Sequence, residues 1–134
     1  MQLKELILLP RPAKIRNRDG FFKINDNLCL NVVEGDKDSL FPVAERLQNI
    51  IKENLNLKPE ITIGKQECTG NKISFVQDNQ LSGEGYHLQI GSEGTRIKYQ
   101  NPSGAFYGVS TLKQLIIQQG RNLIALEIED IPDF

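Results

Sequence analysis

Histidine, cysteine and long apolar runs are all scarce in this sequence. Its 134 residues include one histidine and two cysteines. No stretch approaches the roughly 20 apolar residues that a transmembrane helix needs. Sixteen basic residues nearly cancel seventeen acidic ones, so the clustered basic footprint of a nucleic-acid-binding protein is missing. We therefore expect neither a membrane nor a nucleic acid as a partner.

The two cysteines, Cys29 and Cys68, are too few for a metal-ligand spacing or a disulfide framework. Both fall in or beside apolar, strand-like runs. We interpret them as buried thiols, with a single bridge as the alternative.

The N-terminal stretch "MQLKELILLPRP" contains a short apolar run, "LILL", and the charged Glu5. This run is too short for the core of a secretion signal. We expect a cytoplasmic protein if Met1 is the native start. A periplasmic or secreted protein stays open if Met1 was added to a cut chain.

The chain has the commonest size of one domain, and 39% of its residues are hydrophobic. We expect a single domain over residues 1–134. Two amphipathic helices are predicted. The first covers residues 39–58, with Ser39 as its N-cap and Pro42 in its first turn. The second begins after Asn101, has Pro102 at its first position, and ends at Gly120.

Short β-rich runs surround these helices. "YHLQIG" (86–91) and "TRIKYQ" (95–100) alternate between apolar and polar residues, and "GSEG" between them is a hairpin turn. This alternation is typical of an antiparallel sheet with one covered face. The predicted class is α+β, with a mostly antiparallel sheet and both helices on one face. The further predicted strands cover residues 21–24, 28–33, 60–64, 72–76 and 123–130.

Few residues are candidates for chemistry. His87 lies on the polar side of its strand, and we interpret it as a surface residue. Glu127, Glu129 and Asp130 could in principle hold a cation, but alternating carboxylates usually line a solvated face. Ser103, Ser110 and Thr111 have no histidine partner in the sequence and no nucleophile-elbow motif. "SGEG" (82–85) lacks the Lys-Ser/Thr of a phosphate loop.

Gly104 and Gly108 lie four residues apart in the second predicted helix, where each glycine costs roughly 1 kcal/mol relative to alanine. Either the backbone is exposed to a ligand, or it packs closely against a neighbour. Since no motif supplies the chemistry, we favour packing. The two Cα atoms should then lie against backbone or apolar side chains, with no pocket above them.

Several segments as a set resemble one known family. "EGYHLQI" (84–90), "TRIKY" (95–99), "NPSGAFYGVSTLKQLI" (101–116) and "LEIEDIPDF" (126–134) are similar to the N-terminal accessory domain of glycoside hydrolase family 20, the β-N-acetylhexosaminidases. "LLPRPAKI" (8–15) is similar to the family's opening. In that family the last segment leads into a catalytic (β/α)₈ barrel.

The resemblance implies a zincin-like layout without a metal site. For the whole enzyme it implies removal of terminal N-acetylglucosamine or N-acetylgalactosamine by a substrate-assisted retaining mechanism, with no cofactor. A glutamic acid would protonate the leaving oxygen, and an aspartate would orient the substrate's acetamido carbonyl for attack. Both residues belong to the barrel, beyond Phe134. The resemblance therefore assigns no catalytic, cofactor-binding or metal-binding residue to this chain. Asp133 stands where the family usually has arginine, which leaves the subfamily open.

Three functions are weighed. The favoured one is an accessory domain that is inactive alone and has its own catalytic barrel as partner, with N-acetylhexosamine glycans reached through that barrel. A stand-alone binding module of the same fold is the second, and the domain of an O-GlcNAcase or α-glucuronidase type enzyme shares the layout. A small independent enzyme is the third, and the residues offer no constellation for it.

Overall fold

The computed structural model describes residues 8, 12–33, 37–64 and 71–131. These residues form a seven-stranded sheet and two helices. Along the chain the elements are β1 (Lys14–Lys23), β2 (Cys29–Val33), α1 (Lys37–Leu55), β3 (Glu60–Gly64), β4 (Lys72–Gln77), β5 (Tyr86–Gly91), β6 (Gly94–Tyr99), α2 (Pro102–Gln119) and β7 (Asn122–Asp130).

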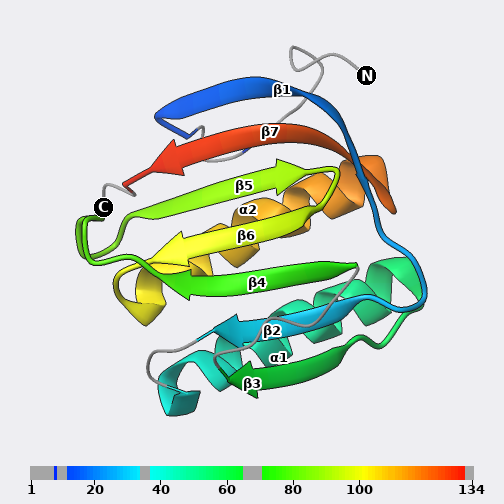
Figure 1. Ribbon diagram of the computed structural model, residues 1–134, viewed down its shortest axis with the longest axis horizontal. Helices are drawn as coiled ribbons and strands as arrows, with labels where there is room; N and C mark the ends of the chain where they lie inside the picture. Colours follow the sequence, from blue (N-terminus) through cyan, green and yellow to red (C-terminus); the bar gives the residue numbers. More distant parts are fainter. Residues whose placement is uncertain (1–7, 9–11, 34–36, 65–70, 132–134) are drawn as a thin grey trace.

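The strands lie in the order β1-β7-β5-β6-β4-β2-β3 (Figure 1). The pairs β1–β7, β7–β5 and β5–β6 are antiparallel, as predicted. The pairs β6–β4, β4–β2 and β2–β3 are parallel. The α+β class is thus confirmed, and the antiparallel prediction describes the half of the sheet from β1 to β6.

The parallel half follows from the position of α1 in the chain. This helix connects β2 to its neighbour β3, and a crossover of that kind makes the two strands parallel. Strand β2 is buried along almost its whole length, whereas burial alternates along most of β5. The clear alternation of residues 86–99 carried information about β5 and β6 alone.

Both helices cover the same face of the sheet (Figure 1). Helix α1 packs on β2 and β3, whereas α2 packs on β5, β6 and β7, and the two helices contact each other. The residues predicted to lie beneath the helices are all buried, which confirms this layer: Tyr86, Leu88, Ile90, Ile97 and Tyr99. Among the described residues, neither helix has the length and apolarity to cross a membrane.

The predicted ends of the helices are partly right. Helix α2 runs from Pro102 to Gln119 between Asn101 and Gly120, as expected, but the Asn101 side chain makes no capping hydrogen bond. Helix α1 begins at Lys37, so Ser39 lies inside the helix and the predicted N-cap there is wrong. Pro42 consequently lies beyond the first turn.

The interpretation of Cys29 as a free thiol is also wrong. Cys29, buried at the start of β2, forms a disulfide bond. Cys68 lies outside the described residues. A disulfide requires two Cα atoms within about 7 Å of each other. Such a distance depends on the three-dimensional arrangement of the chain and cannot be inferred from the separation of two cysteines in the sequence.

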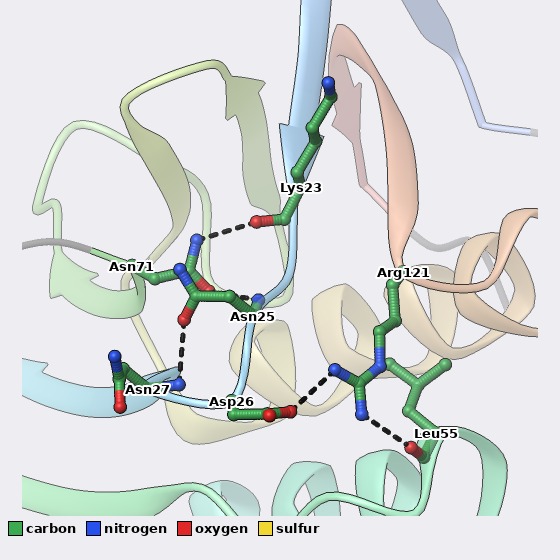
Figure 2. Close-up of polar contacts among 7 residues, drawn as sticks. All are labelled: Lys23, Asn25, Asp26, Asn27, Leu55, Asn71 and Arg121. Carbon is green, nitrogen blue, oxygen red and sulfur yellow. Dashed lines mark hydrogen bonds and ion pairs between the residues drawn. The ribbon is translucent and has the colours of Figure 1, made fainter.

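One corner of the domain is held together by Asn71 and Arg121 (Figure 2). The Asn71 side chain donates to the Lys23 carbonyl at 2.8 Å and accepts from the Asn25 amide at 3.0 Å. Arg121 donates to the Asp26 carboxylate at 2.9 Å and to the Leu55 carbonyl at 3.1 Å. These bonds join the turn after β1 to the end of α1, the start of β4 and the turn before β7.

Candidate functional site

The two helix glycines are packing positions. A Cβ atom on Gly104 would lie 2.3 Å from the Gly85 carbonyl oxygen, and one on Gly108 would lie 2.7 Å from Cγ2 of Ile97. Both glycines are buried. Neither is among the described residues that line the cavities at the β5–β6 turn, along β1 and along α1. The packing prediction is therefore confirmed, and α2 carries no ligand site at these glycines.

The "SGEG" segment supplies the surface on which Gly104 packs. The Gly85 amide donates to the Ser82 carbonyl at 2.8 Å, which closes a tight turn just before β5. The Gly85 carbonyl then points at the α2 backbone. This segment is a structural turn against a helix and has no phosphate-loop geometry.

Ser103 lies in the first turn of α2, and the other two hydroxyl candidates form hydrogen bonds within the fold. Ser110 donates to the Phe106 carbonyl within its own helix at 3.1 Å. Thr111 shares a buried hydrogen bond of 2.6 Å with the Tyr86 hydroxyl. Burial raises the pKa of Tyr86 to about 12; the hydrogen bond to Thr111 opposes this rise, and the negative charge of Asp130 adds to it. The phenol thus stays protonated at neutral pH and ties α2 to β5.

His87 and the β7 carboxylates are brought together, which the sequence analysis missed. The His87 Nε2 atom lies 3.0 Å from Glu127 Oε1 and 3.7 Å from Glu129 Oε1. The Gln89 side chain donates to the same Glu127 oxygen at 3.3 Å. His87 is only 15% exposed, so it is not the surface residue that we expected. The pairing of β5 with β7, two elements far apart in sequence, was the missing information.

Glu127 is held in its charged form by these neighbours. Desolvation raises its pKa, but the hydrogen bonds from Gln89 and His87 and the positive charges of His87 and Arg18 outweigh that effect and lower the pKa overall. The ionised Glu127 carboxylate on β7 can thus form an ion pair with His87 on the neighbouring strand β5 when the histidine is protonated. Asp130 has a separate role, since it accepts a hydrogen bond from the Ala13 amide at 3.0 Å. In the described part of the chain, no group of three or more His, Cys, Asp or Glu side chains could hold a metal ion.

A cavity of about 160 Å³ opens at the β5–β6 turn. Arg18, Lys72 and Arg96 line it together with Gln89 and Glu93. Its residues come from β1, β4, β5 and β6, so no local motif marked it. We consider it below, because its lining is basic and does not match the chemistry of a glycosidase.

A paired-carboxylate site is not formed in the other cavities among the described residues. Glu45 and Glu53 line one groove along α1, but eight helical residues separate them by roughly 12 Å along the axis. Glycosidase carboxylates lie about 5–9.5 Å apart. The described residues of these cavities thus hold no carboxylate pair with the separation that glycoside hydrolysis needs. The neighbouring carboxylates of Glu127 and Glu129 flank His87 instead and line none of these cavities.

Comparisons with known proteins identify the family. The profile described as glycosyl hydrolase family 20, domain 2 matches residues 5–131. A curated β-hexosaminidase from Porphyromonas gingivalis is 29% identical over 142 aligned residues, which cover 98% of this chain and 18% of the relative. The chain thus spans less than a fifth of the curated relative's length.

Solved structures share the fold. The chitobiase of Flavobacterium johnsoniae superimposes with a TM-score of 0.80 at 22% identity, covering 100% of this chain and 22% of that one. An N-acetyl-β-hexosaminidase of Streptomyces plicatus gives 0.76 at 22% identity, covering 96% of this chain and 26% of that one. With the profile match over most of its length, the chain belongs to glycosyl hydrolase family 20, as domain 2, the accessory domain that its sequence resembles.

Proposed function

We propose that this chain is the non-catalytic accessory domain of a larger β-N-acetylhexosaminidase. The observation that carries the proposal is the coverage: the whole chain corresponds to 18–26% of the relatives cited above. The enzyme would remove terminal N-acetylglucosamine or N-acetylgalactosamine by substrate-assisted retention, using an Asp-Glu pair in a catalytic barrel outside these 134 residues. In this proposal the domain's partner is that barrel.

The outer side of α2 is the surface that best suits such a partner. Phe106 and Ile117 are 39% and 57% exposed. They are three helical turns apart, so they lie on one side of the helix, and Ser110 and Lys113 lie between them. The outer side of α1 exposes Phe41 to the same extent, 39%, but is otherwise charged, with Glu45, Arg46, Lys52 and Glu53. Arg46 also lies over the Phe106 ring, 4.9 Å from its centroid. In this proposal, these two apolar side chains on one side of α2 contact the barrel.

Variants of the full-length enzyme test this role. Ile117→Ser should lower the melting temperature of the full-length protein by more than it lowers that of the isolated chain, because only the former loses an apolar contact between domains. Ile63→Ser on the edge strand β3 is the matched control, since Ile63 is 41% exposed. Equal effects of Ile117→Ser on the two proteins would contradict contact through α2.

The second candidate is a stand-alone binding module. The chain's gene discriminates the two, because a downstream reading frame that encodes a barrel with an Asp-Glu pair is required by the accessory-domain proposal. A gene that ends with these residues would contradict the accessory-domain proposal and favour the binding module.

A further inference from the structure

The cavity at the β5–β6 turn lies on the sheet face opposite the helices. Gln89 pairs with Arg96, and Gly91 pairs with Gly94, across the two strands. These residues alternate with Ile90 and Ile97, which are buried, and Ile97 lies against Gly108 of α2. Gln89, Gly91, Gly94 and Arg96 therefore point to the face opposite the helices. Arg96 and Gln89 therefore project from neighbouring strands into the same space.

Strand β1 reaches this space although it is not a neighbour of β5. The β1–β7 register shifts between Asn17 and Phe21. Within the shift, Gly20 has a φ of +99°, which favours glycine. A Cβ atom on Gly20 would lie 4.0 Å from Cβ of Ser92, so β1 passes next to the β5–β6 turn. The irregularity places Arg18 at the edge of the cavity, together with Lys72 from the start of β4.

A carboxylate of the chain itself already lies in the cavity. Glu93 is exposed on the two-residue turn and folds back over Gly91. Its Oε1 and Oε2 atoms lie 2.8 Å and 3.0 Å from the point where a Cβ atom on Gly91 would be. A side chain at Gly91 would therefore meet the Glu93 carboxylate, which is the flexible end of its side chain. Among the described residues, the charged lining consists of three cations and this one carboxylate.

The cavity has the size and chemistry of a small anion site. Its volume of about 160 Å³ is about five times the share of one liquid water, so it can hold a sulfate or carboxylate group with its first waters. Arginine presents donors in a planar fork that matches both groups. We propose that this cavity binds an oxyanion group, a sulfate or a carboxylate, of an acidic ligand, and that the ligand displaces the Glu93 carboxylate.

Titration of the isolated chain with sodium sulfate at constant ionic strength tests the site, because screening is then the same at every point. Amide chemical shifts report the binding. We expect saturable shifts at Gly91 and Gly94, binding at least about tenfold weaker in Arg96→Gln, and binding about threefold tighter in Glu93→Gln, which removes the competing charge. Lys72→Gln should weaken binding in the same direction as Arg96→Gln.

Lys98→Gln is the matched control. Lys98 is on the same strand and face as Arg96 but does not line the cavity. Its loss should change the affinity less than about twofold, since a distant charge is screened. Unsaturable shifts, equal weakening by Lys98→Gln and Arg96→Gln, or an unchanged affinity in Glu93→Gln would each overturn the proposal.

A second titration distinguishes the source of the oxyanion. N-acetylglucosamine 6-sulfate that binds more tightly than inorganic sulfate, with no binding of neutral N-acetylglucosamine, assigns the cavity to an acidic sugar. Equal affinities for the two sulfates assign it to a free anion. Both results support the oxyanion site. This test uses the isolated chain, so it can succeed or fail independently of the hydrolase activity proposed above.

Discussion

Substitution of Gly104 by alanine should destabilise the domain more than the same change at Gly108. A methyl group at Gly104 would meet the Gly85 carbonyl oxygen at 2.3 Å, whereas ordinary contacts begin at 3.4 Å. The α2 and β5 backbones would therefore have to separate by about 1 Å. Such overpacking costs about 1–3 kcal/mol, and the higher helix propensity of alanine returns up to about 1 kcal/mol.

We expect a net loss of about 2 kcal/mol for Gly104→Ala, since backbone cannot rotate away, and about 1 kcal/mol for Gly108→Ala, where the obstacle is a methyl group of Ile97. For a domain of this size 1 kcal/mol corresponds to about 3–5 °C in melting temperature. Thermal and urea unfolding followed by circular dichroism measure both variants. Ser110→Ala on the exposed side of α2 is the control, and it should be near neutral. A Gly104→Ala variant as stable as the wild type would refute the packing account.

Three further predictions concern the polar contacts. The folded pKa of Glu127 lies below its ordinary value of 4.5. The Glu127 carboxylate therefore stabilises the fold above pH 4.5, and this contribution is lost as the pH falls through the folded pKa. Glu127→Gln should thus be less stable than wild type at pH 7, with the difference vanishing at low pH; a difference in urea midpoints that stays constant with pH would contradict this. The pKa of Tyr86 is raised to about 12. The contribution of this phenol to folding stability is therefore complete below pH 10 and is lost between pH 10 and 12. Tyr86→Phe should remove that alkaline loss of stability and cost about 1 kcal/mol at neutral pH. Arg121→Met should cost about 1 kcal/mol of stability, because the hydrogen bond to the Leu55 carbonyl is lost. Asp26→Asn should cost less than about 0.5 kcal/mol, because the Asp26 side chain is 83% exposed. Urea denaturation that ranks the two variants in the opposite order would show that the surface ion pair dominates.

The sequence predicted helices and strands well where neighbouring residues determine them. The alternation of residues 86–99 gave β5, β6 and their hairpin, and the Asn101-Pro102 start and Gly120 end gave α2. The packing role of Gly104 and Gly108 also followed from the sequence, because their cost in a helix needs a reason. The structure adds that Gly108 does not admit a methyl group unless Ile97 moves.

Contacts between strands far apart in the chain could not be predicted from the sequence. The parallel half of the sheet, the partners of His87 and the lining of the basic cavity all depend on which strands become neighbours. Strand β7 inserts between β1 and β5, and this insertion places Glu127 next to His87. Likewise, Arg18 joins Arg96 only because β1 departs from its regular register. The absence of a catalytic constellation was expected from the residues, and the proposal that catalysis lies elsewhere depends on the family.

Hydrolysis of a chromogenic N-acetylglucosaminide by the purified 134-residue chain, beside the full-length gene product, tests the central claim most directly. The account predicts turnover by the full-length protein and none by the chain, since the cavities described above hold no carboxylate pair with the required separation. Turnover by the pure chain that is abolished by substituting one of its own carboxylates would contradict the account.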